Sequence, residues 1–290
     1  MAPRSKIAGV AQMRELNDVS ASSITSMHCG GKIECLFEAD STKELLSLLS
    51  THEEFFVMGG GTNTIFEDGR INIPVIRLGD KFNFIKRDGD SIYAGSATPL
   101  SGLLDFCIRG GLTGLEFAAG IPGKIGGALY MNAGTKDKAI MGKVASIEIA
   151  DKEGIHTIGK EDLNYGYRCG GIPTKAVIIG AHFLLNQASP GIVKKNIELA
   201  LSNRRNQPKG YSSGSIFMNT EEIAAGYLID QAGLKGFRVG GAVVSDRHAN
   251  FIMNQGGATT ADIKTLIKVI KERVRDKFGI ELQEEVAIIG

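Results

Sequence analysis

The residues best suited to chemistry are glycines that gather between residues 114 and 134. Pro122 lies among them and Asn132 follows shortly after. The recurring glycines are Gly120, Gly123, Gly126 and Gly127. Glycine tolerates positive φ and lets bare backbone N–H groups approach a ligand closely. The natural ligand of such a wall is a phosphate or a pyrophosphate.

A second glycine cluster, residues 59–64, directly follows the apolar run 54–58. A strand that leads into glycines with hydroxyl and amide side chains indicates a second phosphate cradle. No Gly-x-Gly-x-x-Gly opens a helix after an early strand, so the usual dinucleotide fingerprint is absent. A Walker A loop is excluded too, because Ala118 replaces its first glycine and Ile125 follows Lys124.

The elements that must position these loops form an α+β pattern. Residues 1–40 are expected to be irregular apart from a strand over 33–39. Ser41 and Glu44 match a capping box for a helix that carries Leu45 and its neighbours. Asp88-Gly89 predicts a hairpin turn, and the segment 151–154 predicts another. Further strands are expected over 54–58, 74–78, 82–87, 91–94, 144–150, 154–158 and, as a central strand, 176–185.

The last third of the chain predicts a small compact unit. A helix is expected to start at Ser189-Pro190 and to carry Arg204 near its end, before Pro208. Thr98-Pro99 similarly predicts an earlier helix through Ile108. Later helices are expected over 221–232 and 260–278, and later strands over 237–239, 250–253 and 280–289.

Composition narrows the class of protein. The chain has 290 residues, 43% hydrophobic and 22% charged, with a formal net charge of +1. The length suits two or three domains, and the charge favours neither nucleic acid nor an anionic membrane. The N-terminus lacks the apolar core of a signal peptide, and no apolar run approaches the roughly 20 residues of a membrane helix. Four cysteines without zinc spacing indicate reduced thiols, no metal site and a cytoplasmic location.

Motifs along nearly the whole chain resemble UDP-N-acetylenolpyruvoylglucosamine reductases, flavoenzymes of bacterial cell-wall precursor synthesis. The segment between Arg168 and Arg204 is short, so the chain resembles the shorter class of this family. The matching stretches are 59–63, 114–123 with Gly126-Gly127, 130–134, 166–168, 204–205 with 207–208, 214–217, 232–236, 240–242 with 244–245, 248–249, 257–259 and 282–286. One departure is Met218, which stands where lysine is common.

The resemblance implies an α+β fold with a two-part FAD-binding region of the vanillyl-alcohol-oxidase/PCMH type and a small α+β substrate-binding domain. We expect the first FAD-binding part over 1–78, together with a returning strand over 280–290. The second part is expected over 79–204 and the substrate-binding domain over 205–279. FAD is the expected bound cofactor and NADPH the expected co-substrate.

The resemblance also implies roles for single residues. Arg168 matches the arginine that faces the enolpyruvyl carboxylate, and a guanidinium can bind a carboxylate through two hydrogen bonds. Ser215 matches the proton donor to C2, and Glu285 the glutamate that polarises the enolate or relays the proton. A carboxylate beside a developing anion predicts a raised pKa. Glu284 should point the opposite way along a strand and serves as an internal control.

Binding residues follow from the same resemblance. Asn219 and His248 are expected to bind the UDP-sugar. The cofactor-binding residues are expected to be Gly59, Gly60, Gly61, Thr62, Asn63, Thr64, Ala119, Gly120, Ile121, Pro122, Gly123, Gly126, Gly127, Asn132, Arg168 and Ile178.

The resemblance implies reduction of UDP-N-acetylglucosamine enolpyruvate to UDP-N-acetylmuramate, with hydride delivered to C3 and a proton from Ser215 to C2. No nucleic acid, membrane insertion or obligate protein partner is expected. Two alternatives remain open: an oxidase of the same flavin fold, and a flavin-binding module without catalysis. Retention of Arg168, Ser215 and Glu285 together argues against the oxidase, since an oxidase needs no such proton-delivery set.

Overall fold

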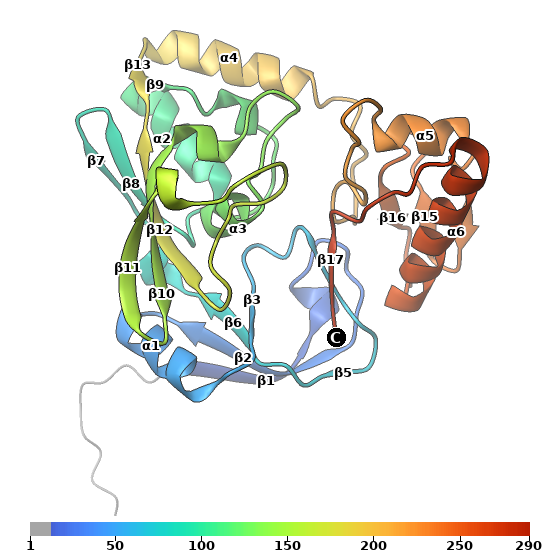
Figure 1. Cartoon of the computed structure of the whole chain (residues 1–290), viewed down its shortest axis with the longest axis horizontal. Helices are drawn as coiled ribbons and strands as arrows, with labels where there is room; N and C mark the ends of the chain where they lie inside the picture. The colour runs from blue at the N-terminus through green and yellow to red at the C-terminus, as the bar shows by residue number, and fades with distance from the viewer. Residues whose placement is uncertain (1–12) are drawn as a thin grey trace, which may run out of the picture.

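The computed structural model describes residues 13–290 and places three groups of elements around a central region. In Figure 1 an N-terminal sheet lies at the bottom, a larger sheet with its helices at the left, and a smaller group at the right. The last strand, β17 (Ala287–Ile289), returns from the right-hand group to the centre. The expectation that the N-terminus is no signal peptide concerns residues 1–12, which lie outside those described.

The N-terminal sheet has the strand order β1-β2-β6-β3, and β5 also pairs with β2. Its strands are β1 (Arg14–Ser20), β2 (Lys32–Ala39), β3 (Phe56–Val57), β5 (Arg70–Ile71) and β6 (Val75–Leu78). The expectation of an irregular start is wrong, because β1 pairs antiparallel with β2. β1 lies at the edge of the sheet and buries none of its seven residues, so it lacks the apolar alternation of a half-buried strand.

Helix α1 (Thr42–Thr51) packs its leucines against this sheet. The Ser41 hydroxyl accepts a hydrogen bond from the Glu44 N–H at 3.2 Å, as the capping box predicts. The Glu44 carboxylate reaches back one residue further than expected and accepts from the Asp40 N–H at 2.7 Å. The cap thus confirms the predicted helix start.

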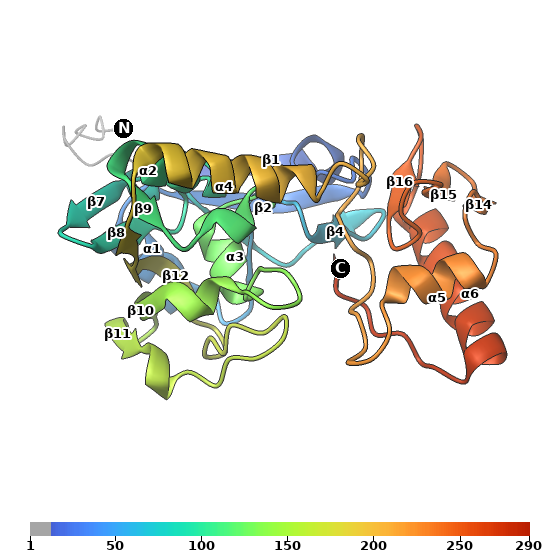
Figure 2. The same ribbon diagram turned by 90° about the horizontal axis from the view of Figure 1, so that it is seen from above.

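The larger sheet is antiparallel, with the order β11-β10-β12-β8-β7. Its strands are β7 (Ile85–Asp88), β8 (Ser91–Gly95), β10 (Val144–Asp151), β11 (Gly154–Gly159) and β12 (Val177–Leu184). Both predicted hairpins and the central strand are confirmed. One face packs against helices α2 (Leu100–Gly110), α3 (Ile125–Tyr130) and α4 (Pro190–Ser202), as Figure 2 also shows.

The ends of two helices differ from the expectation. Thr98 does not cap α2, because its hydroxyl donates to the Phe84 carbonyl at 3.1 Å. Ser189 does cap α4, but that helix ends at Ser202, so Arg204 lies beyond it. A short strand pair, β9 (Leu112–Thr113) with β13 (Asn186–Gln187), completes this region. A second short pair, β4 (Thr64–Phe66) with β17, packs against the N-terminal sheet.

The C-terminal group packs two helices on a small sheet. Its elements are α5 (Ala225–Gln231), β14 (Arg238–Val239), β15 (Ala242–Val244), β16 (Ile252–Asn254) and α6 (Thr260–Phe278). The predicted ends of α6 are confirmed by a capping box at Thr259 and by Gly279 at φ 69°. The apolar stripe of α6 faces a shared core.

Three predictions for this group are wrong. The helix expected over 221–232 begins only at Ala225, because Thr220 and Ile223 form a hydrogen-bonded turn before it. Strand β15 was not expected. The closing strand is short, since only Ala287–Ile289 pairs, with β4. Strand pairing depends on a partner distant in the chain, which periodicity alone does not reveal.

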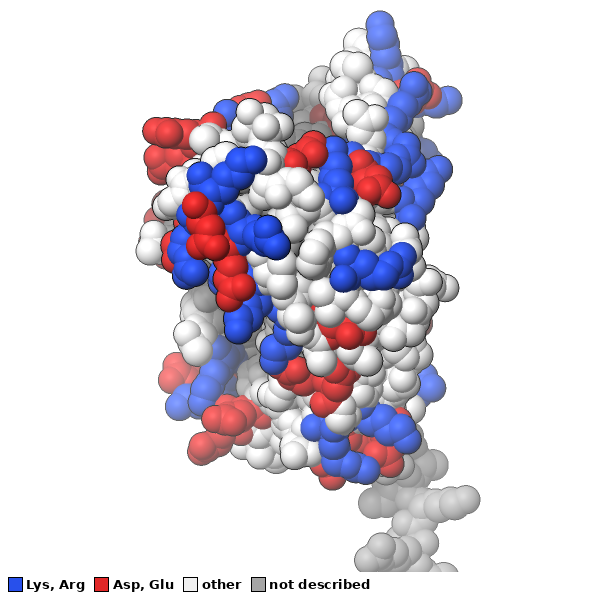
Figure 3. Space-filling view, turned by 90° about the vertical axis from the view of Figure 1, so that its right-hand side faces the viewer, with Lys and Arg blue, Asp and Glu red and all other residues white. Residues whose placement is uncertain are grey.

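The surface carries both signs of charge. Figure 3 shows the face formed by the C-terminal group, where lysine and arginine side chains are interspersed with acidic ones. This mixture agrees with the formal net charge of +1. Within residues 13–290, no helix combines the length and the apolar character needed to cross a membrane. The four cysteines are all free thiols, as expected.

Candidate functional site

The two glycine clusters lie against each other. A Cβ atom built on Gly60 would lie 3.0 Å from the Gly123 Cα atom, and one on Gly59 would lie 3.7 Å from the Gly127 Cα atom. The Thr62 hydroxyl bridges the loops by donating to the Pro122 carbonyl at 3.4 Å. The two clusters that the sequence predicted separately therefore form one surface.

This surface presents N–H groups that lack acceptors. Among residues 13–290, none of the following N–H groups donates a hydrogen bond: Gly59, Gly60, Gly61, Thr62, Asn63, Gly120, Gly123, Lys124 and Gly127. Unpaired backbone donors are costly unless water or a ligand accepts from them. Convergent N–H groups on glycine loops suit a phosphate anion. The residues present therefore fit the diphosphate of FAD.

Two further predicted cofactor residues serve the protein's own framework. Asn132 is buried, its Nδ2 atom donates to the Gly166 carbonyl at 2.7 Å, and its Oδ1 atom accepts from the Met141 N–H at 3.2 Å. Ile178 on β12 belongs to the core beneath the helices. Asn132 thus holds the turn that precedes Arg168, and any contact of Ile178 with the cofactor stays a prediction.

Arg168 and Glu285 form a largely buried ion pair. The Arg168 Nε atom lies 2.7 Å from Glu285 Oε1, and the two side chains are only 17% and 15% exposed. Arg168 adopts φ 56°, a rare conformation for a residue with a side chain, in a turn closed by Gly166 and Cys169. Its guanidinium lies over the Tyr167 ring, 5.0 Å from the ring centre.

The backbone of Glu285 is fixed from both sides. Its N–H donates to the Ile216 carbonyl at 2.7 Å, and its carbonyl accepts from Asn63 Nδ2 at 3.0 Å. Burial raises the pKa of the Glu285 carboxyl, and Arg168 opposes that rise without cancelling it. Glu285 therefore joins the glycine loop of Asn63 to the segment that carries Ser215.

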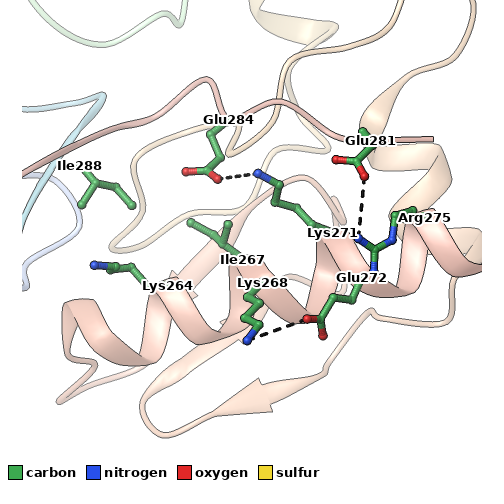
Figure 4. Close-up of a pocket in the computed structure, with 9 residues that line it drawn as sticks. All are labelled: Lys264, Ile267, Lys268, Lys271, Glu272, Arg275, Glu281, Glu284 and Ile288. Atoms are coloured by element: carbon green, nitrogen blue, oxygen red, sulfur yellow. Dashed lines mark hydrogen bonds and ion pairs between the residues drawn. The ribbon is translucent and has the colours of Figure 1, made fainter. Parts of the chain in front are cut away.

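Glu284 points away from this pair, as predicted. Its carboxylate lies 3.0 Å from Lys271 Nζ on α6, as Figure 4 shows. The groove in Figure 4, about 340 Å³ in volume, lies between α6 and the chain segment from Glu281 to Ile288. Its basic side chains are paired with acidic ones, and it includes none of the predicted site residues. This groove is therefore not the candidate site.

Ser215, Asn219 and His248 line one pocket of about 290 Å³ beside α5. Arg247 and Lys235 bring cationic groups to the same pocket, where Lys235 Nζ lies 2.6 Å from Asp230 Oδ2. None of the side-chain hydrogen bonds found within residues 13–290 involves the Ser215 hydroxyl, and Ser215 lines the pocket, where a ligand can reach it. The structure thus gathers the predicted acid and both predicted sugar-binding residues around one cavity.

The neighbours of Asn219 and His248 restrict their roles. Asn219 Oδ1 caps α5 by accepting from the Ala225 N–H at 3.0 Å, which leaves its Nδ2 group for a ligand. His248 Nδ1 accepts from the Asn250 N–H at 3.3 Å, so the neutral ring carries its proton on Nε2. Burial, and secondarily Lys235, lower the His248 pKa.

Some site residues were not assigned a role from the sequence. Arg204 lies against the glycine loop, because a Cβ atom on Gly120 would lie 2.8 Å from its Cδ atom. Burial, followed by the charge of Arg168, lowers the Arg204 pKa. Tyr227, which is 60% exposed, lines the Ser215 pocket. The sequence carries no signal for Tyr227, because its exposure is known only from the structure.

Comparisons with known proteins agree with this geometry. The family model of the C-terminal domain of UDP-N-acetylenolpyruvoylglucosamine reductase matches residues 206–289, and an FAD-binding domain model matches residues 33–158. Named relatives include the UDP-N-acetylenolpyruvoylglucosamine reductase of Geobacter metallireducens, 39% identical over 95% of this chain and 94% of its own length. The enzyme of Syntrophobacter fumaroxidans is 39% identical over 92% of this chain and 81% of its own length.

A solved structure extends the agreement to the whole fold. The crystal structure of the UDP-N-acetylenolpyruvylglucosamine reductase of Thermus caldophilus matches with a TM-score of 0.86 at 30% identity. The match covers 96% of this chain and 99% of that one. The predicted fold class, an FAD-binding region of the PCMH type followed by a smaller domain, is confirmed.

Proposed function

This chain belongs to the UDP-N-acetylenolpyruvoylglucosamine reductase family, and from that membership we propose that it reduces UDP-N-acetylglucosamine enolpyruvate to UDP-N-acetylmuramate with NADPH. Family membership makes it an FAD-binding oxidoreductase of peptidoglycan precursor synthesis. We place it in the cytoplasm, where it serves cell-wall biogenesis and thereby cell shape, the cell cycle and division. We propose the domain limits given above, 1–78 with 280–290, 79–204 and 205–279.

FAD, when bound, supplies the hydride that reaches C3 of the enolpyruvyl group. We propose that the free N–H groups of residues 59–63 and of residues 120–127 hold its diphosphate. Thr64, Ala119 and Ile121 belong to the same two loops. The lack of protein acceptors for these N–H groups supports this assignment.

The protein must stabilise negative charge at C2 and in the adjoining carboxylate, and then deliver a proton to C2. Arg168 is suited to the carboxylate because its charge is permanent and its donors lie in one plane. Glu285, whose pKa is raised by burial, is suited to share or relay a proton beside that charge. The ion pair between them keeps both groups at the junction of the glycine loops and the Ser215 segment.

Ser215 is proposed as the group that delivers the proton to C2. The single observation that carries this proposal is that the Ile216 carbonyl, next to Ser215, accepts the Glu285 N–H at 2.7 Å. This bond brings together three residues that are far apart in the chain: Arg168, Ser215 and Glu285. A general acid must lie within hydrogen-bonding reach of the atom that it protonates.

The UDP portion is proposed to occupy the pocket beside α5. Lys235 and Arg247 are suited to its diphosphate, and His248 and the free Nδ2 group of Asn219 to its polar edges. The Asn219 N–H also donates to the Tyr167 hydroxyl at 3.3 Å, which links this pocket to the Arg168 turn.

The visible spectrum of the FAD-loaded protein under anaerobic conditions tests the reaction. NADPH should bleach the flavin, and UDP-N-acetylglucosamine enolpyruvate should then restore its colour. Bleaching that is reversed only by air would instead support an oxidase. Flavin that neither NADPH nor substrate affects would support a binding module without catalysis.

A further inference from the structure

Asn250 lies beside the segment that carries Ser215, and its side-chain amide pairs with the backbone of that segment as a neighbouring strand would. Its side chain is buried, with 3% exposure. Oδ1 accepts from the Phe217 N–H at 2.9 Å, and Nδ2 donates to the Phe217 carbonyl at 2.8 Å. A carboxamide fits this position because it offers a donor and an acceptor side by side, as a peptide group does.

The backbone of Asn250 extends the same contact. Its carbonyl accepts from the Ile216 N–H at 2.9 Å, and its N–H donates to His248 Nδ1 at 3.3 Å. One residue therefore fixes the two positions after Ser215 and the ring of His248. Each amide atom of its side chain thus makes one hydrogen bond with the Phe217 backbone.

The other edge of the Ser215 segment is held by the C-terminal stretch. The Ile216 carbonyl accepts from the Glu285 N–H at 2.7 Å, and the Met218 N–H donates to the Gln283 carbonyl at 2.8 Å. The segment 215–218 is thus bound between Asn250 on one side and residues 283–285 on the other. Its position is therefore set by hydrogen bonds to its backbone, from the Asn250 side chain and main chain on one side and from the main chain of residues 283–285 on the other.

We propose that Asn250 is a positioning residue for proton delivery by Ser215, an inference that rests on the function proposed above for Ser215. A displacement of about 1 Å at a reacting group can cost about 10²-fold in rate. Removal of the Asn250 amide frees the Phe217 N–H and carbonyl, and the segment loses its alignment with Glu285. The loss should therefore fall on the step in which Ser215 acts.

The test measures both half-reactions of the FAD-loaded, full-length protein. Asn250→Ala should slow flavin reoxidation by UDP-N-acetylglucosamine enolpyruvate about 10- to 100-fold at saturating substrate. Flavin reduction at saturating NADPH should stay within about twofold of the wild-type rate. Asn250→Asp, which keeps the acceptor for the Phe217 N–H but loses the donor, should show an intermediate defect.

Asn254→Ala is the matched control. Asn254 is also buried, and its amide binds the carbonyls of Met27 and His28 and the N–H groups of Gly256 and Ala258. This variant should lose thermal stability as Asn250→Ala does, but keep its reoxidation rate. An equal loss of reoxidation in the control would overturn the proposal, because it would reveal a general structural effect.

A double-mutant cycle decides whether Asn250 acts through Ser215. In a Ser215→Ala background, Asn250→Ala should slow reoxidation by less than about twofold further. Fully additive losses would overturn the inference and leave the acid role of Ser215 intact. Unchanged reoxidation in Ser215→Ala alone would instead remove the proposed function of Ser215. If Asn250→Ala does not fold, wild-type reoxidation in Asn250→Asp would overturn the inference.

Discussion

At the scale of single residues, burial and a neighbouring charge have opposite effects on the pKa of Glu285. Glu285 lies 2.7 Å from the Arg168 guanidinium, which favours the carboxylate, yet burial has the larger effect and raises the pKa of Glu285. A carboxyl with a raised pKa keeps its proton to a higher pH than an exposed glutamate does. Ser215 lacks such a partner, so its acidity must come from the charge that develops on the substrate.

Ser215→Ala should separate the two half-reactions. Flavin reduction by NADPH should be unchanged, whereas reoxidation by substrate should slow about 10²- to 10⁴-fold, as expected for loss of a general acid. Stopped-flow absorbance of the flavin measures both rates. Unchanged reoxidation would exclude Ser215 as the acid.

Glu285→Gln should slow reoxidation by about 10²-fold or more, and Glu284→Gln should change it by less than about twofold. The reason is position, because Glu285 contacts Arg168 while Glu284 pairs with Lys271 at the surface. If protonated Glu285 is the active form, the wild-type rate falls as the pH rises through its raised pKa, and Glu285→Gln lacks that decline. Equal losses in the two variants would contradict the assignment.

At the scale of elements, α3 and the loop before it bring glycines to the cofactor surface. Gly126 is confined, because its N–H donates to the Ser96 carbonyl at 2.9 Å and a Cβ atom would lie 3.0 Å from the Ser96 side chain. Gly127 has no protein atom within 4 Å of its Cβ position and no positive φ. Neither a close contact nor the backbone conformation therefore requires glycine at position 127.

Gly127→Ala should stabilise the FAD-free protein slightly, by up to about 1 kcal/mol, since alanine favours a helix. The same change should weaken FAD binding at least about tenfold, or about 1.4 kcal/mol, because the methyl group would occupy cofactor space. Fluorescence titration of the FAD-free protein with FAD measures the affinity.

Gly102→Ala in α2 is the matched control, because its Cβ position is also free of neighbours and its residue is also helical. It should leave FAD affinity unchanged. Unaltered FAD affinity in Gly127→Ala would contradict the placement of the cofactor at α3.

At the scale of the whole molecule, several contacts join the C-terminal group to the FAD-binding region. The Ser26 hydroxyl donates to the Ser212 carbonyl at 2.7 Å, and the Ser26 N–H donates to the Gly61 carbonyl at 2.9 Å. The His28 and Tyr211 rings stack with their centres 3.9 Å apart. The C-terminal group is thereby linked to the glycine loop that contains Gly61.

Stability at the whole-molecule scale should depend on His248. Its pKa is lowered in the folded protein, chiefly by burial, so the unfolded chain binds a proton at a higher pH than the folded one does. The stabilisation is full above the ordinary pKa of 6.5 and is lost as the pH falls below it. A proton on Nδ1 would also face the Asn250 N–H, donor against donor.

The difference in unfolding midpoint between the wild type and His248→Gln should therefore shrink from pH 8 to pH 5. Thermal unfolding of the FAD-loaded proteins, followed by circular dichroism, measures it. A difference that does not change with pH would show that His248 has its ordinary pKa in the folded protein.

Local signals in the sequence were sufficient to predict many of the elements of this protein. Glycine loops, the Asp88-Gly89 turn, the Ser41 cap and the Thr259–Gly279 limits of α6 were predictable, because each depends on residues close together in the chain. The motif series also indicated the family. The candidate residues Arg168, Ser215 and Glu285 came from that resemblance and not from their own spacing.

Only the tertiary structure decided how these parts meet. Three contacts join segments that are distant in the chain. They are the ion pair of Arg168 with Glu285, the hydrogen bond from Asn63 to the Glu285 carbonyl, and the hydrogen bonds of Asn250 with Phe217. The short extent of β17 likewise depends on β4, a partner distant in the chain. A sequence pattern indicates which face of an element is apolar. The hydrogen-bond partners of a residue, in contrast, depend on how the whole chain packs.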